Sequence, residues 1–143
     1  MSGPNGKKLR SRITTDGIDR APHRAFMRAM GLDDAPMVGV VSQKGEVTPC
    51  NMTHYAQVDY AKEGVAMAGG TPREFTTISV SDGVGMNHEG MKFSLVSREI
   101  IADSIEAVIH GHAYDGLVGY GGCDKTLPGV IMGMVRCNVP SVF

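Results

Sequence analysis

Patterns typical of strands and patterns typical of helices alternate along this chain. Short apolar or alternating runs, typical of strands, occur at residues 37–41, 74–80, 117–120 and 139–143. Helical periodicity, bounded by capping residues and by Gly or Pro, occurs at residues 18–30, 52–68, 98–110 and 128–137. Because helices that link successive parallel strands pack on the faces of their sheet, this order predicts an α/β fold, a parallel sheet with helices on its faces.

Two polar residues mark the expected starts of helices. Asn51 is placed to cap the helix at 52–68, and Ser97 to cap the helix that follows a glycine-rich loop at 81–90. Along that later helix, apolar and acidic side chains fall on different faces: Ile100, Ile101, Ile105, Val108 and Ile109 against Glu99, Asp103 and Glu106. We therefore expect its apolar face to be buried.

The two ends of the sequence differ from the rest. Residues 1–17 carry four basic side chains among Gly, Ser and Thr without any period, which predicts a basic extended arm. Residues 18–143 then form one unit, since 143 residues suffice for a single domain. The last five residues have the pattern of a strand just begun, so we expect this unit to be the amino-terminal part of a larger, truncated domain.

Composition excludes several classes of partner. Lys and Arg total 14 against 15 Asp and Glu, so there is no basic excess to bind a nucleic-acid backbone or an anionic membrane. No apolar run approaches the ~18 residues that a membrane span needs. Three cysteines are too few, and odd in number, for a secreted disulfide scaffold. We expect a cytoplasmic protein with no nucleic-acid or membrane partner.

Chemically versatile residues follow three of the predicted strands. Cys50 comes after the first strand, Asp82 after the second, and Cys123, Asp124 and Lys125 after the third. In parallel sheets, ligands bind outside the carboxyl ends of the strands, where these residues are expected to meet. Thiolates suit iron or zinc, and paired carboxylates suit magnesium. The sequence therefore predicts a metal site at this edge.

Each of these residues also has an ordinary structural role open to it. A single cysteine is most often a small buried hydrophobe, and Asp82 or Asp124 can simply cap a turn. Lys125 can be the ion-pair partner of Asp124, or a base or modified ligand near a metal. We assign Cys137, in an apolar stretch, to the core, and His88 is the one histidine with a site-like position.

Several longer stretches of the sequence also have the character of family motifs. They are Arg20-Ala21-Pro22-His23-Arg24, Thr48-Pro49-Cys50-Asn51, Ala68-Gly69-Gly70-Thr71-Pro72, Glu74-Phe75, Ser81-Asp82-Gly83, His88-Glu89-Gly90-Met91, Ser97-Arg98-Glu99-Ile100-Ile101-Ala102-Asp103-Ser104 and Cys123-Asp124-Lys125-Thr126-Leu127-Pro128-Gly129. These motifs closely resemble the dihydroxy-acid/6-phosphogluconate dehydratase family, and dihydroxy-acid dehydratases in particular. The similarity runs from about Ser11 to Phe143. Asn87 stands where this family usually has glycine.

The resemblance implies a set of cofactors and ligands. It implies that Cys50 and Cys123 bind an iron-sulfur cluster, and that Cys50 in a Pro-Cys-Asn motif favours the 2Fe-2S type. It implies that Asp82, Asp124 and a carbamylated Lys125 bind Mg²⁺. Family members are several hundred residues long, so a third cluster cysteine, a further magnesium ligand and the catalytic base are expected beyond Phe143.

The resemblance also implies an activity. It is the conversion of 2,3-dihydroxy-3-methylbutanoate, and of its 3-methylpentanoate homologue, to the 2-oxo acid in valine and isoleucine biosynthesis, by a homodimer when full length. We expect the 143-residue chain alone to be inactive. One alternative is a sugar-acid dehydratase of the same family, and another is a non-catalytic α/β module that binds phosphate through its glycine loops.

Overall fold

A parallel sheet forms the centre of the protein. The computed structural model describes residues 8–32 and 35–143, and within these ranges it has four strands. They are β1 (Met37–Ser42), β2 (Thr71–Thr76), β3 (Gly116–Gly119) and β4 (Ser141–Val142). All neighbours are parallel and the order is β2-β1-β3-β4. The predicted α/β class with a parallel sheet is confirmed.

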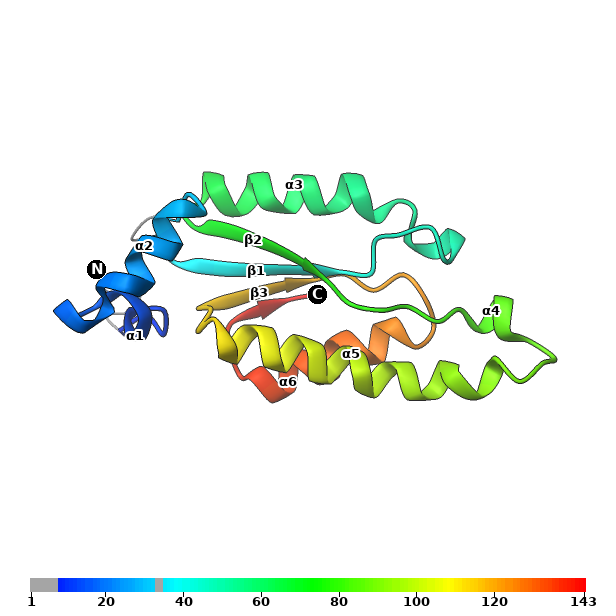
Figure 1. Ribbon diagram of the computed structural model, residues 1–143. Helices are drawn as coiled ribbons and strands as arrows, with labels where there is room; N and C mark the ends of the chain where they lie inside the picture. The colour runs from blue at the N-terminus through cyan, green and yellow to red at the C-terminus, as the bar shows by residue number, and fades with distance from the viewer. Residues whose placement is uncertain (1–7, 33–34) are drawn as a thin grey trace.

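Helices cover both faces of this sheet. Helix α3 (His54–Met67) packs against β1 and β2 on one face, while α5 (Met91–Gly111) and α6 (Thr126–Cys137) lie together on the other (Figure 1). Gly133 on α6 permits this close pairing, because a Cβ there would lie 2.9 Å from the Cβ of Ile105 on α5. The result is a three-layer arrangement of helix, sheet and helix.

The main core lies between the sheet and the α5–α6 pair. Its buried members are Val41, Ile101, Ile105, Ile109, Leu117, Val130, Met134, Cys137 and Val139. Burial of one face of α5 is thus confirmed for Ile101, Ile105 and Ile109, whereas Val108 is half-buried and Ile100 is 46% exposed. Cys137 is a core residue, as expected.

Short helices lie beside the amino-terminal ends of the strands. They are α1 (Arg12–Thr15), η1 (Ile18–Arg20) and α2 (Ala21–Ala29), drawn in blue in Figure 1. Helix α1 falls where an extended arm is predicted, and residues 1–7 of that arm lie outside the described residues. The backbone N–H of Ser11 donates to Asp115 Oδ1 at 2.9 Å, which ties this region to the sheet.

The boundaries of β2 and α5 differ most from the sequence prediction. Strand β2 begins at Thr71 and ends at Thr76, because its partner β1 ends at Ser42, which is paired with Thr76. Helix α5 begins at Met91, well before the predicted cap at Ser97. The Ser97 hydroxyl is inside the helix and donates to the Ser94 carbonyl at 2.6 Å, so it caps nothing.

The predicted cap at Asn51 is also wrong. Asn51 ends a short 3-10 turn, η2 (Pro49–Asn51), and α3 starts three residues later at His54 without a side-chain cap. No helix in the described part of the chain has the length and the hydropathy to cross a bilayer.

Candidate functional site

The loops that carry Cys50 and Cys123 touch one another beyond the carboxyl ends of β1 and β3 (Figure 1). A Cβ on Gly122 would lie only 2.5 Å from the carbonyl oxygen of Cys50, so only glycine fits there. Cys50 is exposed and Cys123 is 7% exposed. Two cysteines that are far apart in the sequence therefore lie on adjoining loops.

Thr126, the first residue of α6, stabilises the Cys123 loop through hydrogen bonds. The Thr126 hydroxyl accepts hydrogen bonds from the N–H groups of Gly122 at 3.1 Å and Cys123 at 2.8 Å, and donates to the Cys123 carbonyl at 2.8 Å. Thr126 is fully buried. Its hydroxyl therefore fixes the backbone of the loop that precedes α6, a role that the sequence motif alone does not show.

A second cluster contains the other three predicted residues. Lys125 Nζ lies 3.0 Å from Asp82 Oδ2 and also pairs with Asp124. Asp82 is the first residue of a short helix, α4 (Asp82–Gly85), at the same end of the sheet. The structure thus brings together two carboxylates and one amine from different loops.

Asp82 has a second hydrogen-bond partner, which the sequence motifs do not reveal. Ser94 on α5 is 1% exposed, and its hydroxyl donates to Asp82 Oδ1, so Oδ2 is left for Lys125. The Ser94 hydrogen bond, with that of Lys125, lowers the pKa of the Asp82 carboxyl. Pairing with Asp124 and then Asp82 raises the pKa of Lys125. Asp82 and Lys125 are therefore held in their charged forms.

Several buried polar side chains lie near the cysteine loops without a partner. Within the described residues, the unpaired atoms include Thr48 Oγ1, both amide atoms of Asn51, and His54 Nδ1. These three side chains are 3% exposed or less. Burial lowers the pKa of His54, so its imidazole is neutral at pH 7. Such unpaired groups are uncommon in protein interiors and point to a partner outside this chain's own atoms.

The glycine-rich loop after β2 is fixed by its own backbone contacts. Asn87 has φ 62°, a left-handed conformation that glycine and asparagine both adopt, which explains how it replaces the family's usual glycine. His88 bonds the Val84 carbonyl through Nε2 at 2.8 Å and accepts from the Gly90 N–H at 3.0 Å. Through these two hydrogen bonds the His88 side chain stabilises the conformation of the loop.

The donor sets at this edge are partial. Among residues 8–32 and 35–143, no group of three or more His, Cys, Asp or Glu side chains is arranged to hold a metal ion. The structure instead offers two pairs, the thiols of Cys50 and Cys123 and the carboxylates of Asp82 and Asp124 with Lys125 between them.

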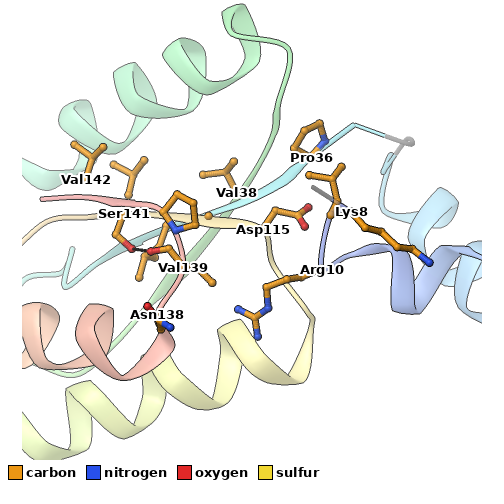
Figure 2. Close-up of a pocket in the computed structure, with 14 residues that line it drawn as sticks. Lys8, Arg10, Pro36, Val38, Asp115, Asn138, Val139, Ser141 and Val142 are labelled. Carbon is orange, nitrogen blue, oxygen red and sulfur yellow. Dashed lines mark hydrogen bonds between the residues drawn. The ribbon is translucent and has the colours of Figure 1, made fainter. Parts of the chain in front are cut away.

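A cavity of about 650 Å³ lies at the opposite end of the sheet, beside the amino-terminal ends of β1, β3 and β4 (Figure 2). Its walls are mainly apolar, and its charged side chains already have partners. Asp115 accepts from the N–H of Ser11 and Met37, and Arg10 donates to His110 at 2.7 Å. Lys8 pairs with Asp16 at 3.1 Å. Each charged side chain in the described walls of the cavity therefore already has a hydrogen-bond or ion-pair partner.

Comparison with known proteins identifies the family. Residues 35–143 match the model described as dihydroxy-acid/6-phosphogluconate dehydratase N-terminal. Dihydroxy-acid dehydratase 3 of Bradyrhizobium diazoefficiens is 80% identical over 97% of this chain, and the chain covers 25% of that protein. Dihydroxy-acid dehydratases of Pelagibacter ubique and Thermosynechococcus vestitus are 58% and 51% identical over 100% and 94% of the chain.

The chain spans about a quarter of the length of these relatives. The family model covers residues 35–143, including all four strands of the sheet and every residue of the two donor sets. With the predicted resemblance confirmed, this chain belongs to the dihydroxy-acid/6-phosphogluconate dehydratase family and corresponds to its amino-terminal part.

Proposed function

We propose that this chain is the cofactor-holding amino-terminal part of a dihydroxy-acid dehydratase. The substrates proposed are 2,3-dihydroxy-3-methylbutanoate and its 3-methylpentanoate homologue, which lose water to give 2-oxo acids. The observation that carries the proposal is the grouping at one sheet edge of two thiols on touching loops and of two carboxylates around Lys125. Similarity to proteins named dihydroxy-acid dehydratase supports the reaction.

The residues suit the two groups that the family resemblance implies. Cys50 and Cys123 supply soft thiolate donors for a 2Fe-2S cluster, and unpaired buried donors beside them suit its anionic sulfur atoms. Asp82, Asp124 and Lys125, once carbamylated, supply oxygen donors for Mg²⁺. When bound, these groups would supply Lewis acidity that helps the 3-hydroxyl to leave and that makes the C2–H of the substrate more acidic.

The chain's own residues fix where this chemistry happens. Ser94 orients the Asp82 carboxylate by its hydrogen bond to Oδ1. Thr126 holds the backbone of the Cys123 loop through three hydrogen bonds. We propose that the base that removes the C2 proton belongs to the part of the relatives that this chain does not span. The homodimer and the cytoplasmic location stay predictions.

We propose further that the 143-residue chain does not dehydrate any substrate alone. Two thiols are fewer than the three cluster cysteines that the family resemblance implies, and two carboxylates with one lysine leave magnesium short of ligands. Because metal binding and loop order are coupled, the missing ligands also weaken the loops that carry the present ones.

A chimaera tests the function. Residues 1–143 replace the matching segment of the Bradyrhizobium diazoefficiens relative, and the purified protein is reconstituted with iron, sulfide and Mg²⁺ without oxygen. Formation of 2-oxo acids is then assayed with branched dihydroxy acids, gluconate, arabinonate and 6-phosphogluconate. We expect turnover of the branched substrates in the chimaera and none in the isolated chain.

The outcomes separate the alternatives. Preference for a sugar acid would replace the proposed substrate with the family's other substrate class. Iron-free protein that binds inorganic phosphate would favour the non-catalytic module. Turnover by the isolated chain comparable with that of the chimaera would contradict the proposed inactivity.

A further inference from the structure

Asn51 combines complete burial with an amide that has no hydrogen-bond partner. Its side chain is 0% exposed, and neither Nδ2 nor Oδ1 has a partner in the described structure. A buried amide without partners is costly, since it gives up its bonds to water and gains none. Because Asn51 does not cap α3, helix formation does not explain its position.

His54 and Thr48 are also buried polar side chains with an atom that has no hydrogen-bond partner. His54 Nδ1 and Thr48 Oγ1 are buried and unpaired. A Cβ on Gly122 would lie 2.7 Å from His54 Nε2 and 3.0 Å from Asn51 Oδ1, so both side chains reach the residue next to Cys123. Asn51 is itself the neighbour of Cys50. The neutral polar side chains of Asn51 and His54 therefore occupy the space where the two cysteine loops meet.

The chemistry of these side chains limits their missing partner. An amide, a hydroxyl and a neutral imidazole each provide an N–H or O–H donor. None of the three carries a negative charge that would repel an anion. The groups expected beside them are sulfur atoms with negative charge, which accept hydrogen bonds from N–H donors, and such bonds help to set the reduction potential of iron-sulfur clusters.

We propose that Asn51 and His54 are positioning residues that donate hydrogen bonds to the sulfur atoms of the group held by Cys50 and Cys123. This inference rests on the proposed function. The bonds provide partners for buried donors, fix the two cysteine loops at one separation, and raise the reduction potential of the bound cluster.

The test uses the chimaera described above, with substitutions that keep shape and change hydrogen bonding. Asn51→Leu and His54→Leu remove the donors, Asn51→Asp replaces a donor with an anion, and His54→Gln keeps an N–H. His23→Leu is the matched control, because His23 is exposed on α2, far from the loops. For each protein we measure iron content, midpoint potential, cluster loss to a chelator, and the Tm of the iron-free and iron-bound forms.

We expect Asn51→Leu and His54→Leu to shift the midpoint potential to more negative values and to weaken iron retention about tenfold. Asn51→Asp should have the largest effect, His54→Gln should restore most of the potential, and His23→Leu should match wild type. The iron-free Tm of Asn51→Leu should equal or exceed that of wild type, because an unpaired buried amide is removed.

Two results would overturn the inference alone. One is wild-type potential and iron retention in both leucine variants. The other is a Tm loss in iron-free Asn51→Leu as large as in its iron-bound form, which would mean that the amide has a purely structural partner. A wild-type chimaera that binds no iron, or a Cys123→Ser variant that binds it fully, would overturn the proposed function and this inference together.

Discussion

Polar side chains at the two ends of the sheet differ in their hydrogen bonding. At the amino-terminal end, both oxygens of Asp115 accept backbone N–H groups at 2.9 Å, and Arg10 is bonded to His110. At the carboxyl-terminal end, Asn51 and His54 are buried with unpaired atoms. Asp115 and Arg10 thus have partners within the chain, whereas Asn51 and His54 have donors without one.

This difference distinguishes polar side chains that stabilise the fold from those that we propose bind a cofactor. A carboxylate with hydrogen-bond partners, such as that of Asp115, contributes to stability, and its removal should lower the free energy of unfolding. A buried amide without partners, such as that of Asn51, lowers the stability of the metal-free chain, and its removal should weaken cofactor binding. Substitutions at the two ends should therefore change different measurements.

The largest effect is expected for Gly122→Ala. The added methyl would lie 2.5 Å from the Cys50 carbonyl oxygen, so the two cysteine loops must separate. We expect the chimaera to lose nearly all bound iron and about 2 kcal/mol of unfolding free energy. The control is Gly64→Ala inside α3, where a Cβ meets nothing within 4 Å and should stabilise by about 0.5–1 kcal/mol. Full iron content in Gly122→Ala would refute the contact between the loops.

Ser94→Ala should weaken Mg²⁺ binding about tenfold, because Asp82 loses the donor that orients it. Calorimetric titration of the chimaera with Mg²⁺ measures this. Ser97→Ala is a closely matched control, since Ser97 is equally buried on the same helix but donates only to the Ser94 carbonyl. Equal affinities in the two variants would show that Ser94 does not position Asp82.

Asp115→Ala should lower the free energy of unfolding by about 2 kcal/mol, because two backbone N–H groups lose a charged acceptor. Iron content should stay at the wild-type value, since Asp115 lies at the other end of the sheet. Urea unfolding and iron analysis measure both quantities, with exposed Asp19→Ala as the control. Loss of iron in Asp115→Ala would show that the two ends of the sheet are not independent of each other.

Glu74→Gln should have the smallest effect, and one that depends on pH. Burial opposes ionisation of Glu74, but hydrogen bonds from Lys44 and Lys62 outweigh it and lower the pKa. A lowered carboxyl pKa stabilises the folded chain above the unfolded value of about 4.3, and this contribution is lost as pH falls through the folded pKa. We expect a cost of about 1 kcal/mol at pH 7 that shrinks below pH 4. A cost that persists unchanged in acid would exclude an electrostatic origin.

The positions of the chemical residues at the sheet edge follow from the sequence. Alternation predicts parallel strands, and a parallel sheet places Cys50, Asp82 and Cys123 beyond the same ends of those strands. The end of β2 was less predictable, because the β-type pattern runs on to Val80 and only the length of β1 stops the pairing at Thr76.

The residues that support the site could not be predicted in the same way. Ser94 reaches Asp82 only because α5 begins at Met91 and runs back past α4, which no local pattern reveals. Asn51 has the sequence position of a helix cap, and only tertiary structure shows it buried without a partner. Contacts made across the fold are not encoded in the spacing of neighbouring residues.

The central claim is that this edge of the sheet holds an iron-sulfur group through Cys50 and Cys123. Iron and sulfide per chain, with the visible absorption spectrum, are measured in the reconstituted chimaera and in Cys50→Ser, Cys123→Ser and Cys137→Ser. We predict loss of both in the first two variants, and wild-type content in the third, because Cys137 is a buried core residue on α6. Full cluster content in Cys50→Ser or Cys123→Ser would contradict the account.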